Sequence, residues 1–389
     1  MQSEKRYRVL IDYPIPDIGL YGGLSFPPVL KAGLARRKEF EVFDSTSSVD
    51  GDLDAIIIFN GGSHRDLTDL RLGTFSWEPL AQELYTKKPA MSRRIGRYIG
   101  LRRMRFYDRL LFRNREYEKT ILRFRRKNPS ARIIHRLDGN YRNICKRYGF
   151  DASVRFINDL ADVTIHQSEY SRWVWETGVH TLFGKTQTLV PKNSKVVSNG
   201  VNPDQFSHVG SKRELEGTIR LLHVSASASP NKGLHTVLEL ANILRDNHEV
   251  QFYLVGNQLM DPLCGSDIAH FENVHFLGAV KSRDELAEIY RSVDIFVFPS
   301  VNDCSPNVIL ESMSCGTPVV AIDSGGSKEL IIKSDYRGGV LIEPLNPVTA
   351  IRTIIDHKNA FSEGALQVIN KYHSLDQMID RYSAEIKGH

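Results

Sequence analysis

The sequence predicts an α/β fold in which two similar domains each carry a parallel sheet covered by helices. Short β-type runs alternate with helical patterns through most of the chain, and this alternation specifies a parallel sheet with helices on both faces. Asp294–Ser300 is almost continuously apolar, as expected for a strand that is buried on both faces. At 389 residues the chain also exceeds the size at which a single core keeps growing, so we expect two domains.

The composition excludes several classes of protein. Hydrophobic residues make up 41% of the chain and charged residues 25%, which is typical of a globular protein and not of a disordered or fibrous one. No stretch reaches the ~18 apolar residues of a membrane span, and the charged start leads straight into a strand instead of a signal peptide. The 4 cysteines lack the paired spacing of zinc ligands, so we expect no metal site, no disulfide framework and a reducing, cytoplasmic compartment. They are Cys145, Cys264, Cys304 and Cys315.

Strand segments are expected in both halves of the chain, with amphipathic helices between them. In the first half they are Arg6–Tyr13, Phe40–Ser45, Asp54–Asn60, Ala131–Asp138, Asp162–Ser168 and Lys195–Gly200. In the second half they are Ile219–Ser225, Val250–Asn257, Val274–Ala279, Asp294–Ser300, Pro318–Asp323 and Gly338–Glu343. The helical segment 234–245 illustrates the other pattern, because Leu234, Val237, Leu238 and Ala241 share one face.

The domain boundary is predicted after Gly200, where a strand ends and Pro203 precedes a polar stretch. We therefore assign residues 1–200 to an N-terminal domain and 201–372 to a C-terminal domain. Residues 373–389 are expected to form a helix that packs back on the N-terminal domain, since its apolar stripe must be covered. Ligands of open parallel sheets bind outside the carboxyl ends of the strands, so the two domains would enclose a cleft. The stripe consists of Leu375, Met378, Ile379, Tyr382 and Ile386.

The main candidate for an anion site is the start of a short helix in the second half. Ser305 is a good N-cap and Pro306 suits the first helical position, and Gly316 would end the helix after Cys315. Unpaired N–H groups and the positive end of the helix dipole make such a start a ready phosphate site. These donors would be the N–H groups of Asn307, Val308 and Ile309.

Two carboxylates flank this helix start. Glu311 lies one turn further on the face of Asn307 and could accept hydrogen bonds from the neighbouring hydroxyls of a ribose. Asp303, in the preceding loop, could take hydroxyls on the other side of the phosphates. Phosphates flanked by two polyhydroxyl groups describe a nucleotide sugar. The alternative is that Glu311 is a solvated helix residue and Asp303 an ordinary turn residue.

Two further segments are candidates for ligand contact. Lys232 opens a helix after Ile219–Ser225 and would add positive charge to a phosphate site, unless it is merely exposed. Gly22 and Gly23 follow the first strand and either allow a close approach to a ligand or form a plain tight turn. The chain lacks GxxxxGK[ST], and no GxGxxG follows the first strand, which weakens ATPase and dehydrogenase hypotheses.

Several motifs in the second half together resemble the retaining GT-B glycosyltransferases of family 4 (glycosyl transferases group 1). The family's EX7E element corresponds to DCSPNVILE, with Asp303 and Glu311 at the two carboxylate positions. SNGVNPDQF is similar to the family's interdomain signature, and VHFLGAV to the strand whose backbone near Val280 meets the nucleotide base. CGTPVVAIDSGGSKELI resembles the tail of the motif.

The resemblance implies a GT-B fold, two Rossmann-like domains facing across a cleft, with the acceptor on the N-terminal side. It implies a metal-independent transfer that retains configuration, uses a nucleotide-sugar donor and needs no other cofactor. Glu311 would bind the ribose and Asp303 would lie near the transferred sugar. The donor-binding residues expected are Gly22, Gly23, Ser227, Lys232, Val280, Asp303, Ser305, Pro306, Asn307, Val308 and Glu311.

Two departures from the family pattern concern the donor side. Asp303 replaces the usual first Glu and is one methylene shorter, and Ser227 replaces the Arg that usually accompanies the Lys on the diphosphate. Without that Arg, the diphosphate loses a charge-assisted hydrogen bond worth ~1.5–3 kcal/mol. Lys232 and the helix dipole would therefore have to carry more of the leaving-group stabilisation.

For the polar residue that faces the sugar from the first domain, His135 and Asp138 are both catalytic candidates, because the alignment can slide. A buried structural role is the alternative for either, and His166 is a less favoured candidate.

The net charge of +5 hides a strongly basic segment. Residues 91–127 contain 14 Lys or Arg against 3 Asp or Glu, a local charge of +11. Apolar residues are interleaved with these arginines, which is typical of helices that lie on anionic membranes, each charge contributing ~1 kcal/mol. A peripheral membrane location and a lipid-linked acceptor are therefore hypotheses, against a solvated helical pair as the alternative. No nucleic-acid partner is expected, since no recognised module accompanies the patch.

The favoured function is sugar transfer from a nucleotide-sugar donor to a glycan or lipid-linked acceptor, as in polysaccharide biosynthesis. A second hypothesis is a non-catalytic GT-B adaptor that binds anionic membranes or nucleotides, motivated by Ser227 and Asp303. No sequence feature favours a third possibility, a GT-B-shaped epimerase or phosphorylase.

Overall fold

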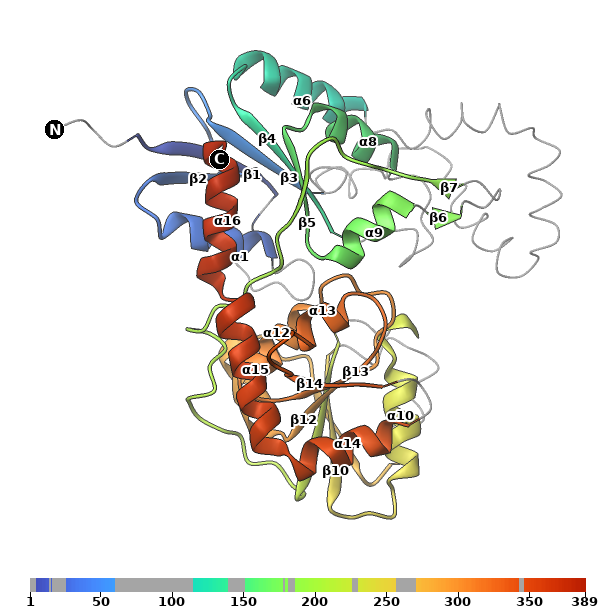
Figure 1. The fold of residues 1–389 in the computed structure, drawn as a ribbon. Coiled ribbons are helices and arrows are strands. Elements are labelled where there is room, and N and C mark those ends of the chain that lie inside the picture. Colours follow the sequence, from blue (N-terminus) through green and yellow to red (C-terminus); the bar gives the residue numbers. More distant parts are fainter. Residues whose placement is uncertain are drawn as a thin grey trace, which may run out of the picture.

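The computed structural model describes residues 5–13, 15, 26–59, 115–138, 151–177, 179–180, 186–225, 230–256, 271–342 and 346–389. Its strands form two sheets of six strands each and one two-stranded pair. The two large sheets lie in separate halves of the molecule, with helices beside each (Figure 1). All the predicted strand segments contain a strand of these two sheets, which confirms the α/β class. The antiparallel pair β6 (Val179–His180) and β7 (Thr186–Gln187) was not predicted, because two-residue strands leave no periodic signal.

The N-terminal sheet has the strand order β2-β1-β3-β4-β5-β8. All its pairings are parallel, so the carboxyl ends of its strands lie at one edge. One face packs on α1 and on the last helix of the chain, and the other packs on α6 and α8. The strands are β1 (Tyr7–Asp12), β2 (Phe40–Asp44), β3 (Ala55–Phe59), β4 (Arg132–Leu137), β5 (Val163–His166) and β8 (Ser194–Val196). The helices are α1 (Phe26–Ala35), α6 (Arg115–Lys127), α8 (Asp151–Leu160) and α9 (Glu169–Thr177).

The C-terminal sheet repeats the plan with the order β11-β10-β9-β12-β13-β14. It is also parallel throughout. Its strands are β9 (Ile219–Val224), β10 (Val250–Val255), β11 (Val274–Gly278), β12 (Ile295–Phe298), β13 (Val319–Ile322) and β14 (Gly339–Ile342). Its helices are α10 (Leu234–Ile243), α11 (Arg283–Ser292), α12 (Asn307–Ser314), α13 (Ser327–Ile331), α14 (Pro347–Asp356) and α15 (Lys358–Tyr372), preceded by the 3-10 turn η2 (Pro230–Lys232).

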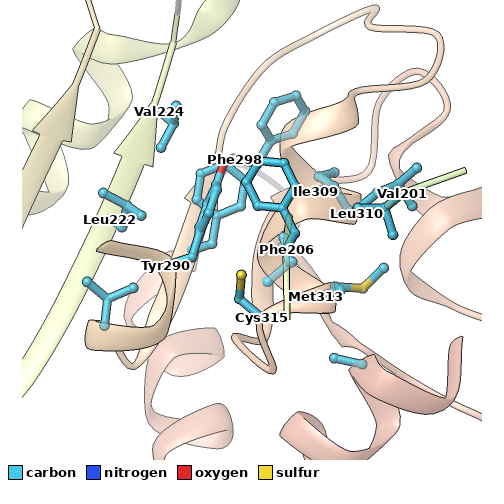
Figure 2. Close-up of a cluster of buried hydrophobic side chains, with 14 of the residues drawn as sticks. Val201, Phe206, Leu222, Val224, Tyr290, Phe298, Ile309, Leu310, Met313 and Cys315 are labelled. Carbon is cyan, nitrogen blue, oxygen red and sulfur yellow. The ribbon is translucent and has the colours of Figure 1, made fainter. Parts of the chain in front are cut away.

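Strand β12 is buried on both faces, as its apolar sequence predicts. Phe296 and Phe298 belong to the core under α11, α12 and α15, part of which Figure 2 shows, whereas Ile295 and Val297 belong to the core under α10 and α14. Because successive side chains of a strand point to opposite faces, this strand needs apolar residues at every position. The strand that leads into the predicted anion site is thus held from both sides.

The last helix, α16 (Leu375–Lys387), lies on the N-terminal sheet (Figure 1). Its predicted stripe is buried in the core of that sheet and next to α1. Burial of each such side chain contributes about 1.5–3 kcal/mol, so the helix adds substantially to the stability of a domain far away in sequence. The stripe consists of Leu375, Met378, Ile379, Tyr382 and Ile386.

The chain crosses between the two halves twice, and the crossings lie side by side. Val201 forms a parallel β-bridge with Ser374, and its N–H donates to the His373 carbonyl at 3.0 Å. A Cβ on Gly200 would lie 2.7 Å from the Ser374 carbonyl oxygen. The close contact of the two crossings therefore requires glycine at this position.

Most of the basic segment lies outside the described residues, which include only α6 from it. Tyr117 and Ile121 of α6 are buried against the sheet, while Leu122 is 37% exposed. Across the described ranges, no helix is both long and apolar enough to cross a bilayer.

Candidate functional site

The loops that follow the strands of the two sheets contact each other directly. Glu329 of α13 accepts hydrogen bonds from the backbone N–H groups of Glu169, at 2.8 Å, and Tyr170, at 2.6 Å, in the first turn of α9. The Tyr170 hydroxyl donates to Asn302 Oδ1 at 3.1 Å. A carboxylate at a helix start satisfies N–H groups that lack partners inside the helix and faces the positive end of its dipole. The predicted ligand edge of one domain thus faces that of the other.

The start of α12 differs by one residue from the prediction. Pro306, and not Ser305, occupies the N-cap position, with φ of −70° and ψ of 112°, and helical geometry begins at Asn307. The Ser305 hydroxyl is buried and makes no hydrogen bond in the described structure. The N–H of Ile309 donates to the Pro306 carbonyl at 3.2 Å, so it is not among the open donors that the sequence suggested. Proline lacks an N–H and therefore suits a position where that donor would have no helical partner.

The far end of α12 is as predicted. The helix ends at Ser314 with Cys315 as C-cap, and Gly316 follows with φ of 76°. This left-handed conformation is the usual reason for glycine just beyond a helix.

A glycine pair holds the loop that carries Asp303. The N–H of Gly326 donates to the Asp303 carbonyl at 2.8 Å. A Cβ on Gly325 would lie 2.3 Å from that same carbonyl oxygen, and one on Gly326 would lie 2.0 Å from the Cys304 carbonyl oxygen. Only glycines allow the loop after β13 to lie against the loop after β12, so the pair fixes the position of Asp303.

Lys232 and Asp303 form an ion pair, with Lys232 Nζ 2.7 Å from Asp303 Oδ2. The turn η2 is held by the Asn231 carbonyl, which accepts from the N–H of Val301 at 2.9 Å. Gly233 has φ of 76°, and a Cβ there would meet the Pro299 carbonyl oxygen at 2.5 Å. The fold therefore brings two predicted site residues from different loops together, and Lys232 is not merely an exposed lysine.

Glu311 is buried next to two polar side chains. The Tyr290 hydroxyl donates to its Oε2 at 3.5 Å, and Arg283 lies 3.7 Å from its Oε1. Burial raises the pKa of Glu311 from 4.5 to about 7, against the opposing effect of Arg283. Glu311 is thus poised to titrate near neutral pH and is not a solvated helix residue.

A small cavity adjoins this carboxylate between the two domains. Its volume of about 20 Å³ is enough for about one water molecule. Phe26 and Val29 of α1 line it from the N-terminal domain, and Asn307, Glu311 and Arg283 line it from the C-terminal domain. A ribose needs more room, so its binding to Glu311 requires that α1 or the Arg283 side chain move.

The structure separates the candidates of the first domain. His135 is fully buried within β4, and its Nδ1 lies 3.3 Å from Asn158 Nδ2 of α8, so it belongs to the packing under that helix. Asp138 follows the end of β4, is about one third exposed and pairs with Arg136 at 3.0 Å. His166 is buried, which lowers its pKa to about 3, and its ring nitrogens have no hydrogen-bond partner in the part of the chain that the structure describes. Asp138 is therefore the candidate at the ligand edge.

Two residues of the site region were missed by the sequence analysis. Arg136 is completely buried and donates to Asn199 Oδ1 at 2.7 Å. Asn199 Nδ2 in turn donates to Asn307 Oδ1 at 2.7 Å. Arg136 lies in an apolar strand and Asn199 in an Asn-Gly pair, so the only signal was an arginine where a buried strand needs none.

The remaining donor-binding candidates are two valines of the C-terminal domain and three residues outside the described ranges. Val280 belongs to the C-terminal core, so only its backbone is open to a ligand role, and Val308 packs partly buried against that core. Among the described residues no group of three or more His, Cys, Asp or Glu side chains is placed to hold a metal ion. Gly22, Gly23 and Ser227 lie outside the described residues.

Comparisons with known proteins give a family and several relatives. The family described as Glycosyl transferases group 1 matches residues 218–357. D-inositol 3-phosphate glycosyltransferase of Geodermatophilus obscurus is 31% identical over 221 residues, which is 50% of this chain and 48% of that protein. N,N'-diacetylbacillosaminyl-diphospho-undecaprenol alpha-1,3-N-acetylgalactosaminyltransferase of Campylobacter jejuni is 36% identical over 107 residues, 27% of each chain. The chain thus spans half or less of the length of these curated relatives.

A solved structure extends the likeness over both domains. HepE of Anabaena, in complex with UDP and glucose, matches 99% of this chain and 100% of its own with a TM-score of 0.59 at 16% identity. At that identity the likeness establishes a shared two-domain fold.

Proposed function

Since the chain has the GT-B fold and its residues 218–357 match the family described as Glycosyl transferases group 1, we propose that it moves a sugar from a nucleotide-sugar donor to an acceptor. The observation that carries the proposal is the arrangement around α12. A Lys232–Asp303 ion pair of 2.7 Å lies just before the helix start, and a buried glutamate lies one turn further along the helix. Positive charge beside a helix start suits a diphosphate, and carboxylates on either side suit the hydroxyls of two sugars.

Each part of the donor has a proposed contact. The diphosphate lies between Lys232 and the first N–H groups of α12, with Asn307 donating to a sugar or phosphate oxygen. The ribose hydroxyls donate to Glu311 once the small cavity beside it has opened, and the base lies against the backbone near Val280. The structural neighbour HepE was solved with UDP and glucose, so uridine nucleotides are the first donors to test.

In the proposed reaction the bond between C1 of the sugar and the terminal phosphate oxygen breaks, and its electron pair stays on the diphosphate. The oxygen of the acceptor hydroxyl forms the new bond to C1 on the same face, which retains the configuration, and its proton passes to the departing phosphate oxygen. Lys232 and the dipole of α12 stabilise the charge on the diphosphate, so no step needs a metal ion. Asp303 and Asp138 contact the transferred sugar from opposite domains.

The acceptor is proposed to be a glycan or a lipid-linked sugar. The Campylobacter jejuni relative is named for a substrate linked to undecaprenol diphosphate, and α6 exposes Leu122 beside Arg123, Arg126 and Lys127. A basic helix face with an exposed apolar residue suits attachment to an anionic membrane. Liposomes with anionic lipid should therefore sediment the protein at low salt and release it at high salt. Failure to sediment with anionic liposomes at low salt would refute the membrane contact, and equal sedimentation with neutral liposomes would show that charge does not drive it.

Calorimetry with UDP-, GDP- and ADP-sugars tests the function. We expect one nucleotide series to bind and its sugar donor to be slowly hydrolysed, because water can replace the acceptor. Glu311→Ala should weaken binding about tenfold or more, since a buried carboxylate that accepts two hydroxyls is lost. Glu239→Ala removes an exposed glutamate of α10 as the control and should change nothing. Absence of binding by every nucleotide sugar would refute the proposal.

A further inference from the structure

The guanidinium of Arg136 is the starting point of a chain of polar contacts that crosses the domain boundary. The side chain is completely buried. It donates to Asp138 Oδ1 at 3.0 Å, to the Tyr382 hydroxyl at 2.8 Å and to Asn199 Oδ1 at 2.7 Å. Gln167 Oε1 lies at a longer 3.4 Å. A guanidinium has five N–H donors and no acceptor, and it stays charged at all accessible pH values. Every group that forms a hydrogen bond with it must therefore present an acceptor atom, here an oxygen.

This requirement determines how the amide of Asn199 is oriented. An asparagine amide has an acceptor at one end and a donor at the other, and the two ends are easily exchanged in a structure. With its oxygen held by Arg136, Asn199 must present its NH2 group on the other side. There it donates to Asn307 Oδ1 at 2.7 Å and lies 3.4 Å from the Ser305 carbonyl oxygen. The Ser305 carbonyl can only accept a hydrogen bond, so it agrees with an NH2 group at this end of Asn199.

The same logic extends to Asn307, the first residue of α12. Its oxygen accepts from Asn199, so its NH2 group is the end turned away from the domain crossing. Asn307 also lines the cavity that it shares with Glu311. An NH2 group at this place can donate to a phosphate or hydroxyl oxygen, whereas a carbonyl oxygen there would repel it.

We propose that Arg136 and Asn199 are positioning residues that orient the Asn307 amide as a hydrogen-bond donor toward the nucleotide sugar. This rests on the proposed function for the identity of the ligand, but the orientation itself rests only on the contacts of the protein. Each amide accepts a hydrogen bond with its oxygen and donates with its NH2 group. Because Arg136 donates to the first amide, the NH2 group of the second amide is the one that faces the ligand. Because Arg136 belongs to the N-terminal sheet and Asn307 to the C-terminal domain, the orientation is set only when the two domains hold this arrangement.

The test inverts the polarity of the relay without changing its shape. In Asn199→Asp the carboxylate still accepts from Arg136, but it has no N–H for Asn307. Asn307 must then turn its NH2 group toward the new carboxylate and its oxygen toward the ligand. We expect the nucleoside diphosphate that the wild type binds most tightly, among UDP, GDP and ADP, to bind about tenfold or more weakly to this variant.

Gln167→Glu is the matched control. It brings the same negative charge to the same guanidinium, but the hydrogen bond of Gln167 goes to Arg136 and not to Asn307. The control should bind the nucleotide as the wild type does, and both variants should unfold at similar urea concentrations. Unchanged affinity in Asn199→Asp, or an equal loss in Gln167→Glu, would overturn the relay.

A second measurement needs no ligand, so it separates the relay from the proposed function. At pH 5, where Glu311 is largely protonated, Asn307→Asp should lower the urea midpoint little, because Asn199 then donates to a carboxylate that also lies at the positive end of α12. The double variant with Asn199→Asp places two carboxylates against each other, and its midpoint should fall by more than the sum of the single changes. Additive effects in the double variant would show that the amides are oriented otherwise. If the wild type binds no nucleotide while the double variant behaves as expected, only the proposed function fails.

Discussion

Replacing Glu311 with Gln should make the protein more stable at pH 8 while weakening donor binding. Burial raises the pKa of this carboxyl from 4.5 to about 7 in the folded chain. Glu311 therefore ionises at a lower pH in the unfolded state than in the folded state, and the wild type loses stability as the pH rises from about 4.5 through 7. The difference between these pKa values corresponds to about 3 kcal/mol at pH 8. Glutamine has the same shape and no charge, so the variant avoids this loss.

Urea unfolding of wild type and Glu311→Gln at pH 5, 6, 7 and 8 measures the effect. The variant should be more stable than the wild type by about 1 kcal/mol at pH 5, and this difference should grow to about 3 kcal/mol at pH 8. All other titrating groups are shared, so the difference between the curves isolates Glu311. Arg283 loses a charged partner at 3.7 Å, but it is about one quarter exposed and can be solvated, which limits that cost to well under 1 kcal/mol.

Donor affinity supplies the second half of this prediction. UDP-glucose is a suitable probe, because its diphosphate is esterified at both ends and does not titrate near neutral pH. Wild-type affinity should rise as the pH increases through about 7, since the ionised carboxylate is the better acceptor for ribose hydroxyls. The variant should bind more weakly with no such pH dependence. Two results would refute the conclusion that Glu311 is a buried carboxylate that faces the ligand. One is a variant that is less stable than the wild type at pH 8, and the other is a variant whose donor affinity depends on pH as much as that of the wild type.

Three further changes probe the surroundings of α12. Lys232→Met should weaken nucleoside diphosphate binding about tenfold or more in calorimetry with little effect on unfolding, because its partly exposed pair with Asp303 contributes under about 1 kcal/mol. Gly326→Ala should lower the free energy of unfolding by about 1–3 kcal/mol in urea titration, since the new Cβ would lie 2.0 Å from the Cys304 carbonyl oxygen; an unchanged midpoint would mean that the loop relaxes freely. Glu329→Ala should cost about 1 kcal/mol in the same assay, because two N–H groups at the start of α9 lose their acceptor.

The elements of the fold followed from local patterns, and the errors were local too. Continuous apolar runs located the strands, and the stripe from Leu375 to Ile386 identified a helix that had to be covered. The helix start was placed one residue early, because Ser305 has the side chain of an N-cap while Pro306 has the backbone of one. Propensity describes side chains, but the cap position is set by where the backbone leaves the extended conformation.

The sequence predicted the site from the positions of two acidic residues around one helix start. The structure added contacts between residues that are far apart in the sequence. Glu311 was singled out by its position one turn after the helix start and Asp303 by its place in the loop before it, and their spacing resembled a family motif. Nothing in the sequence indicated that Asp303 would pair with Lys232, or that His135 would lie in the core while Asp138 lies at the strand end. His135 and Asp138 are both polar residues of one predicted strand segment, and only the packing of α8 on His135 shows which of them is buried.

By itself the sequence determined which segments are strands and helices, and that one acidic residue lies before the start of a helix and another one turn inside it, because these depend on patterns between near neighbours. The tertiary structure alone decided which distant groups meet, as in the relay from Arg136 through Asn199 to Asn307. It also decided the pKa of Glu311, because the cost of ionising a carboxyl depends on how much water the surrounding elements exclude. Contact between remote loops and desolvation are properties of the assembled sheets, and neither is carried by any one stretch of chain.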